Sequence, residues 1–157
     1  MDFTQTDLGS ILKKANTQLY LKPIWYAVFS DVKFKETILN WIKQDQLIRQ
    51  GIDENGRVIG RYSEFTERVD PRKVAGTPYT LYDTGEFFRS MFISVLYDAS
   101  IVIDADADKT DYTGAVTNLF DKFGEGIVGL TEFNREKLIY ECIERFNSEA
   151  RAVLLND

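Results

Sequence analysis

The stretch Thr77-Pro-Tyr-Thr-Leu-Tyr-Asp-Thr-Gly-Glu-Phe-Phe-Arg-Ser-Met91 carries more structural signals than any other part of the chain. Asp83 and Glu86 have the spacing of a capping box, in which two side chains satisfy free backbone amides at the start of a helix. Two phenylalanines and a methionine then give this helix an apolar face. We therefore predict a rigid connector with a short helix over residues 83–91.

Two runs with the pattern of β-strands follow this helix, at 92–97 and 100–105. Apolar side chains alternate along both runs, and Asp98-Ala-Ser between them is typical of a tight turn. The pair should form an antiparallel hairpin at about 92–105 with one face buried. The residues expected on the buried face are Ile93, Val95, Ile101 and Ile103.

Two helices are predicted before this segment. Residues 4–20 have apolar side chains at helical spacing, and Pro23 should stop or offset that helix. Asp31 should cap a second helix, which ends at Gly51. Leu39 and Leu47 deviate from its apolar stripe. The stripe of the first helix consists of Leu8, Ile11, Leu12, Ala15 and Leu19, and that of the second of Phe34, Ile38, Trp41 and Ile42.

The clearest helix begins after Thr131. Its apolar residues fall within about 120° on a helical wheel. They are Ile139, Cys142, Ile143, Phe146, Ala150, Val153 and Leu154. Taken together, the elements predict an α+β fold with N-terminal helices, a central antiparallel β-sheet, and a long C-terminal helix packed on the sheet. A single structural domain over residues 1–157 is expected.

The connections between these elements carry their own signals. Asn55-Gly56 predicts a small hairpin ribbon. Residues 63–79 are polar and contain prolines, which predicts a long loop of the kind that is often functional or becomes ordered only on assembly. We expect an acidic loop at 106–113, a helical turn at 118–123 and an extended segment at 126–129.

The composition is that of a folded chain without a spanning segment. Hydrophobic residues make up 44% of the 157 residues and aromatic residues 13%, which excludes disorder over most of the length. The single cysteine, Cys142, excludes an internal disulfide framework. No apolar run approaches the roughly 18 residues that cross a bilayer, and the N-terminus lacks a signal-peptide pattern. We expect synthesis in the cytoplasm and no membrane partner.

Charge is distributed unevenly along the chain. Residues 1–97 hold 13 basic and 12 acidic side chains, whereas residues 98–157 hold 6 basic and 13 acidic ones. An acidic half repels phosphate backbones, which argues against sequence-specific DNA binding. The chain also has no histidine, so the commonest general base and the commonest metal ligand are both missing. These features favour a protein that is not an enzyme.

One group of carboxylates suggests chemistry. It consists of Asp104, Asp106, Asp108 and Asp111. Their alternation resembles the start of a calcium loop, but Lys109 stands where that loop needs a glycine and Ala115 where it needs a glutamate. Two interpretations stay open: a nonstandard cation site and a solvated acidic turn.

The remaining reactive or aromatic residues have structural interpretations. Cys142 lies on an apolar stripe with no histidine to activate it, so a buried structural thiol is expected. Trp25 and Trp41 are expected in the core, and the lysine pairs at 13–14 and at 33 and 35 on solvated helix faces. No catalytic, cofactor-binding or metal-binding residue is therefore assigned, and no cofactor.

The segment Leu81-Tyr-Asp-Thr-Gly-Glu-Phe-Phe-Arg-Ser-Met91 resembles a segment of bacteriophage tail-completion proteins of the virion-morphogenesis family. In that family the segment precedes a β-hairpin and then a phenylalanine-glycine step. Here the hairpin is 92–105 and the step is Phe123-Gly124, so the resemblance covers roughly residues 77–130. The histidine and the basic-proline segment that family members carry near the glycine step are absent from this chain.

The resemblance implies a structural virion protein at the phage head–tail junction, made in the host cytoplasm. It would be a neck, tail-completion or connector subunit in a homo-oligomeric ring that contacts other neck, portal or tail proteins. DNA would pass through the channel without sequence-specific binding. Two alternatives stay open: a metal-dependent hydrolase that uses the Asp104–Asp111 carboxylates, and a monomeric adaptor that binds one partner through the loop at 63–79.

Overall fold

Three helical segments form one continuous column through the molecule. The computed structural model describes residues 21–110 and 114–155, so the helix predicted at 4–20 lies outside the described part of the chain. The column consists of α2 (Leu21–Ser30), α3 (Val32–Asn40) and the π-helix η2 (Trp41–Ile48). Residues 24–29, which the sequence left unassigned, belong to α2, and Pro23 lies in its first turn, where no backbone N–H is needed.

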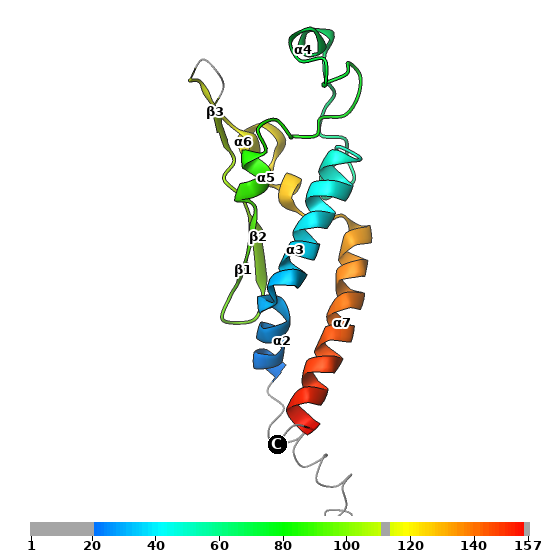
Figure 1. The fold of residues 1–157 in the computed structure, drawn as a ribbon, viewed down its shortest axis with the longest axis vertical. Coiled ribbons are helices and arrows are strands. Elements are labelled where there is room, and N and C mark those ends of the chain that lie inside the picture. The colour runs from blue at the N-terminus through cyan, green and yellow to red at the C-terminus, as the bar shows by residue number, and fades with distance from the viewer. Residues whose placement is uncertain (1–20, 111–113, 156–157) are drawn as a thin grey trace, which may run out of the picture.

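A β-hairpin and a long helix lie along two sides of this column (Figure 1). The hairpin consists of β1 (Phe92–Val95) and β2 (Ile101–Asp104), and β1 contacts both α2 and α3. The long helix α7 (Glu132–Leu155) packs against α2. The predicted α+β fold is thus confirmed, with one correction: α7 packs on the helical column, which separates it from the hairpin.

The other elements are short. They are α4 (Glu64–Val69), α5 (Glu86–Ser90), β3 (Asp108–Thr110), β4 (Val116–Asn118), α6 (Leu119–Phe123) and the 3-10 helix η3 (Glu125–Val128). Because β3 pairs with β4, the acidic loop predicted at 106–113 is partly strand, and the expected central sheet is two separate two-stranded sheets. The helical turn at 118–123 is confirmed. The extended segment predicted at 126–129 is wrong, since most of it is 3-10 helix.

The predicted hairpin has the register that its alternation requires. Ile93 pairs with Ile103 and Val95 with Ile101, so these four side chains share one face. Ile93 is buried in the main core and Ile103 packs against it. The opposite face carries Phe92 and Val102, which are exposed. The hairpin prediction is therefore confirmed in both its strands and its buried face.

The change from α-helix to π-helix after Asn40 rotates the buried face of the column. Asp31 caps α3 as predicted, because its Oδ1 accepts a hydrogen bond from the Phe34 amide at 2.7 Å. An α-helix would next turn Asp45 toward the core, whereas the wider π turns bury Gln46 and Leu47. The off-stripe position of Leu47 was the visible sign of this rotation.

A buried polar network then joins η2 to the start of α7. The Gln46 side chain is fully buried; its Nε2 donates to the Gly129 carbonyl at 2.8 Å. Its Oε1 accepts from the Thr131 amide at 3.0 Å and from Asn134 Nδ2 at 2.7 Å. Thr131 Oγ1 also accepts from the Asn134 amide at 3.4 Å, as the predicted cap requires. All the hydrogen-bonding atoms of the Gln46 amide thus have partners, which fixes where α7 begins.

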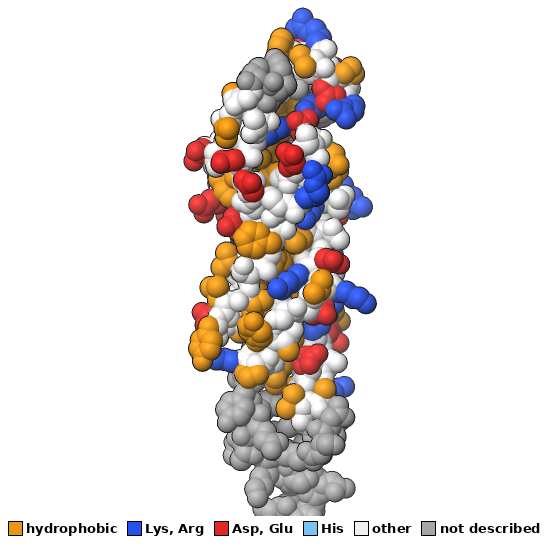
Figure 2. Space-filling view, turned by 60° about the vertical axis from the view of Figure 1, so that its left-hand side comes forward, with side chains coloured by type: hydrophobic (Ala, Val, Ile, Leu, Met, Phe, Trp, Pro, Cys, Tyr) orange, Lys and Arg blue, Asp and Glu red, His pale blue; other side chains and the backbone are white. Residues whose placement is uncertain are grey.

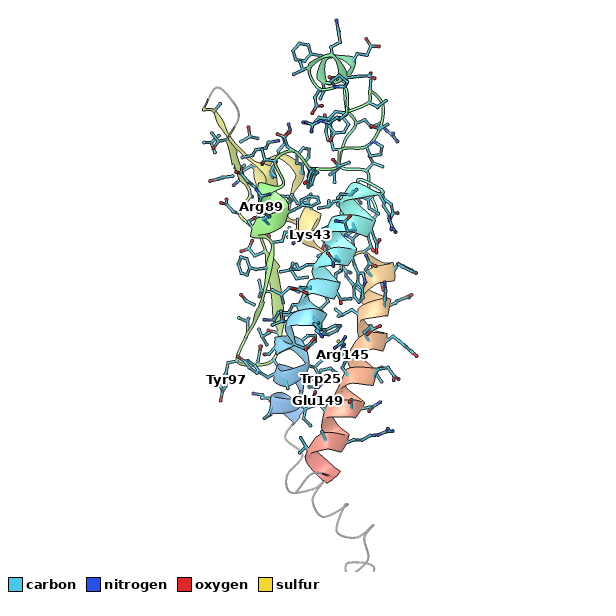
Figure 3. All side chains as sticks on the ribbon, in the orientation of Figure 1. Trp25, Lys43, Arg89, Tyr97, Arg145 and Glu149 are labelled. Carbon is cyan, nitrogen blue, oxygen red and sulfur yellow. The ribbon has the colours of Figure 1, made fainter. Side chains whose placement is uncertain are left out.

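The apolar stripe predicted for α7 is only half covered. Cys142 is buried and Phe146 packs its ring 4.6 Å from that of Trp25 on α2. Arg145 points into the same interface, with its guanidinium 4.2 Å from the Phe34 ring (Figure 3). In contrast, Ile139 is 60% exposed and Ile143 51% exposed. Only part of the predicted stripe is therefore buried, because the buried face of α7 is centred to one side of it.

Candidate interaction site

Residues 61–78 form an arm that projects from the end of the helical column (Figure 1). The sequence predicted a long loop here, and about a third of it is the helix α4. No residue of α4 is buried, and Phe65 and Val69 are 71% and 69% exposed. These two residues are four apart, so they lie on one face of the helix. We call Phe65 and Val69 the arm tip.

The arm is held closed at its base by a short antiparallel ladder. Arg61 and Pro78 form a β-bridge, and the Tyr62 amide donates to the Thr77 carbonyl at 3.0 Å. The Gly76 amide donates back to the Tyr62 carbonyl at 2.9 Å. Below this ladder, the Tyr79 ring lies between those of Tyr62, at 4.8 Å, and Phe123, at 5.8 Å. The base of the arm is thus packed against α6 of the body.

Gly60 permits this close packing. A Cβ atom at Gly60 would overlap the Tyr79 ring, and its φ of +152° is rarely adopted by other residues. A side chain here would push the tyrosine out of the stack that holds the arm. We infer that glycine is needed at this position so that the two segments that form the base of the arm can approach each other closely.

Hydrogen bonds inside the arm hold α4 even though it is too short to be stable alone. Ser63 Oγ accepts from the Thr66 amide at 3.2 Å and so caps the helix. Glu67 Oε2 accepts from the Ala75 amide at 3.2 Å, which ties α4 to the returning chain. Arg72 makes a paired contact with Asp70, and this holds the pKa of Asp70 down, at about 2. The arm tip is therefore presented by an ordered scaffold.

Asp83 is the ionic connection between the arm and the body. Its Oδ1 lies 3.1 Å from Lys73 Nζ of the arm, and its Oδ2 lies 2.7 Å from Lys109 Nζ of β3. The hydrogen bonds from Lys109 and from Lys73 lower the pKa of Asp83. The predicted capping box is wrong: α5 begins at Glu86 behind Gly85, whose φ is +79°, and the Glu86 amide donates to Thr84 Oγ1 at 3.4 Å and not to Asp83. The Asp83 carboxylate instead forms ion pairs with Lys73 and Lys109, which lie in other segments of the chain.

A cleft of about 330 Å³ lies at this junction. Its walls come from the base of the arm, from the segment around Asp83 and from the β3–β4 end of the body, and they include Tyr62, Tyr79, Tyr82, Lys109, Lys122 and Phe123. Its volume is at the lower end of the range for small-molecule sites. Three basic residues (Lys73, Lys109, Lys122) and three acidic residues (Asp83, Glu86, Asp108) line the cleft, so it has no excess of positive charge to bind an anion.

Removing the Asp83 carboxylate is expected to loosen the arm without unfolding the body. Asp83→Asn should cost about 1 kcal/mol, the upper end for partly exposed ion pairs after solvent screening. The lowered pKa means that this contribution is present above the unfolded pKa near 4 and is lost as the pH falls through the folded value. At pH 7, backbone amides of residues 61–78 should therefore exchange faster in Asp83→Asn than in the wild type. At a pH below the folded pKa of Asp83, the two proteins should exchange at the same rate.

Asp45→Asn is the control, because Asp45 forms its ion pair with Arg49, four residues further along the chain and outside the arm. Equal exchange in the arm of wild-type protein and Asp83→Asn at pH 7 would contradict the role given to Asp83.

The carboxylates singled out by the sequence do not converge. Asp104 Oδ1 accepts from the next amide in the chain at 2.7 Å, and Asp106 Oδ1 from the Asp108 amide at 3.1 Å. Asp108 Oδ1 accepts from Asn118 Nδ2 at 2.7 Å. Asp111 lies outside the described residues. Over 21–110 and 114–155, no group of three or more acidic or cysteine side chains could hold a metal ion.

The cysteine and the two tryptophans considered in the sequence analysis lie in or against the core. Burial raises the pKa of the Cys142 thiol to about 11, which leaves it protonated and unreactive at neutral pH. Trp41 is buried and Trp25 packs against the core, as predicted. The arm tip was missed: the polar composition of 63–79 was noted, but not the helical spacing of Phe65 and Val69. That spacing was the signal that could have found it.

Comparisons of the chain with known protein families, with curated proteins and with solved structures gave no match. In the parts of the chain that the structure describes, none of the helices has the length and apolarity needed to span a bilayer.

Proposed function

We propose that this protein is a structural subunit that works by assembling with copies of itself, and that the assembly is a ring at a phage head–tail junction. The arm tip is the observation that supports assembly most strongly. Phe65 and Val69 are exposed on a helix with no buried residue, so they contribute no burial free energy to the isolated chain. Exposed apolar side chains on an ordered projection are typical of a contact with another protein.

A second exposed apolar surface is available to receive the arm tip. It lies on the outer face of the β1–β2 hairpin, where hydrophobic side chains gather in Figure 2. The residues are Phe92, Leu96, Tyr97 and Val102, and we call them the hairpin patch. Tyr97, at the end of the hairpin, is 94% exposed and points away from the body (Figure 3).

Contact between the arm tip of one copy and the hairpin patch of the next is heterologous, since two different surfaces meet. Such an interface leaves one free surface of each kind on every partial assembly, and it closes into a ring if its rotation permits. The place in the virion rests on the resemblance of residues 81–91 to tail-completion proteins. Asp106 and Asp108 are exposed, as the wall of a channel that repels passing DNA requires, whereas Asp104 pairs with Phe92 and so lies on the face of the hairpin patch.

Complementation between two defective variants tests this proposal. Phe65→Ser with Val69→Ser removes the arm tip, and Phe92→Ser with Val102→Ser removes much of the hairpin patch. Each variant alone should remain a monomer in sedimentation velocity, while the wild type forms larger species. An equal mixture should give heterodimers and nothing larger, because only one intact interface can form between the two variants.

The control is Tyr140→Ser on α7, which removes an exposed ring away from both surfaces and should assemble like the wild type. Assembly of the arm-tip variant at the wild-type concentration would overturn the proposal, as would a mixture that stays monomeric. The location is tested separately by the genes beside this one, among which portal, capsid and tail-tube genes are expected.

A further inference from the structure

We propose that the cleft at the base of the arm receives the Tyr97 side chain of a second copy of this chain. The inference rests on the assembly proposed above and deepens it, because it adds a second contact to the interface between arm and hairpin. The cleft lies between the base of the arm, the segment around Asp83 and the β3–β4 end of the body, and it measures about 330 Å³.

The walls of the cleft combine aromatic rings with balanced charges. The rings are those of Tyr62, Tyr79, Tyr82 and Phe123, and Tyr79 already meets Tyr62 and Phe123 edge to face. Walls of this kind favour a further ring. Because basic and acidic residues line the cleft in equal number, neither an anion nor a cation is preferred. A neutral ring with a hydroxyl group fits, since a phenol can donate to a carboxylate and accept from an ammonium group.

Tyr97 has the chemistry that the cleft requires. Its side chain is 94% exposed at the end of the β1–β2 hairpin. In the described part of the chain its ring meets Lys22, whose Nζ lies 5.6 Å from the ring centre. An aromatic ring that stays in water contributes little to the stability of the isolated chain, whereas the same ring buried in an interface contributes strongly to binding.

The positions of the cleft and of Tyr97 require that a second copy supplies the ring. The arm projects from one end of the helical column, while the turn of the β1–β2 hairpin lies beside α2, toward the other end (Figure 1). Tyr97 lies at that turn and points away from the body (Figure 3). It therefore cannot reach the cleft of its own chain.

Both surfaces are continuous with the contact proposed between arm tip and hairpin patch. Thr66 follows Phe65 on α4 and lines the cleft, so the cleft opens beside the arm tip. Tyr97 belongs to the hairpin patch and lies five residues after Phe92, about 17 Å further along an extended chain. A hairpin that covers the arm tip brings Tyr97 to the cleft when its turn points toward the body of the neighbouring copy. The inference thus fixes the direction in which the hairpin crosses the arm.

The heterodimer expected from the two complementing variants gives a test in which each copy is the control for the other. In it, the arm-tip variant (Phe65→Ser with Val69→Ser) supplies the hairpin patch with Tyr97. The hairpin-patch variant (Phe92→Ser with Val102→Ser) supplies the arm and the cleft. Tyr97→Ser added to the arm-tip variant should raise the Kd of the heterodimer about tenfold or more. The same change added to the hairpin-patch variant should leave the Kd unchanged, because Tyr97 of that copy faces solvent.

Thr117→Trp tests the contact from the side of the cleft. Thr117 is exposed on β4 and lines the cleft, so an indole at this position takes the space assigned to Tyr97. Added to the hairpin-patch variant, it should raise the Kd about tenfold or more; added to the arm-tip variant, it should have no effect. Tyr97→Phe in the arm-tip variant should keep the Kd within about threefold, because the ring is retained and one hydrogen bond is lost.

Sedimentation velocity over a dilution series gives the Kd of each mixture. A heterodimer whose Kd is the same with and without Tyr97→Ser in the arm-tip variant would overturn this inference and leave the proposed assembly standing. Equal weakening by Tyr97→Ser in either copy would also overturn it, since the residue would then act through the fold of its own chain. If no heterodimer forms, the proposed assembly fails and this inference fails with it.

Discussion

Replacing Gln46 with leucine is expected to destabilise the fold strongly, although leucine is apolar and of similar size. The side chain makes three hydrogen bonds that join η2 to the start of α7, and leucine can make none of them. Its loss leaves the Thr131 amide, the Asn134 side chain and the Gly129 carbonyl without this partner in a buried region. We expect the free energy of unfolding to fall by about 3 kcal/mol or more, measured by urea denaturation.

Gln44→Leu is the matched control for Gln46→Leu, because Gln44 lies on the exposed side of the same π-helix. Its stability should stay within about 0.5 kcal/mol of the wild type. Equal stability of the two leucine variants would mean that the Gln46 network does not hold α7 in place.

The second large effect is expected at the β1–β2 hairpin. Ile103 faces Ile93 on the buried side, so Ile103→Asp would place a charge against the main core. The lost burial is worth roughly 1.5–3 kcal/mol, and the buried carboxylate adds a further cost. Together these terms are comparable to the whole stability of an ordinary domain, and we expect the variant not to fold. Circular dichroism and thermal melting of the purified chain measure this.

Val102→Asp tests the same strand on its other face. Val102 is the neighbouring residue and is exposed, so an aspartate there should leave the melting temperature close to that of the wild type. If Val102→Asp unfolds the chain while Ile103→Asp does not, the faces of the hairpin have been assigned the wrong way round.

The elements that could be predicted from sequence are those that local signals determine. Alternation around the turn at Asp98 is sufficient for the hairpin, because a period of two fixes which residues share a face. Asp31 and Thr131 were identified as caps because a cap acts on amides within its own helical turn. The ends of α6 are also set by local contacts: the Asn118 side chain accepts from the Asp121 amide, and the Gly124 amide donates to the Phe120 carbonyl.

The elements that could not be predicted depend on distant partners. Asp83 has the spacing of a cap, yet two lysines from other segments bind its carboxylate. The π-helix that buries Gln46 makes sense only beside Gly129 and Asn134, more than eighty residues away. The strand at 108–110 has three residues and little periodicity, and pairing with β4 determines its structure. In each case a tertiary contact overrides the local signal.

The candidate site was predicted only in outline. The length and composition of residues 63–79 predicted a loop of the kind that is often functional. They did not predict α4, which is six residues long and whose order depends on Ser63, Glu67 and the ladder at the base of the arm. The hairpin patch was implied by the alternation of β1 and β2, since a two-stranded hairpin with apolar residues on both faces leaves one face exposed. The proposed contact between the hairpin patch and the arm tip could be formulated only from the three-dimensional arrangement.

Single-particle electron microscopy of the assembled wild-type protein tests the central claim most directly. We expect closed rings in which the arm of each copy, residues 61–78, lies against the β1–β2 hairpin of the next, with Phe65 and Val69 buried in the contact. Rings in which every arm extends into solvent would contradict the proposed contact between arm and hairpin. A chain that stays monomeric at the highest concentration that can be imaged would contradict it as well.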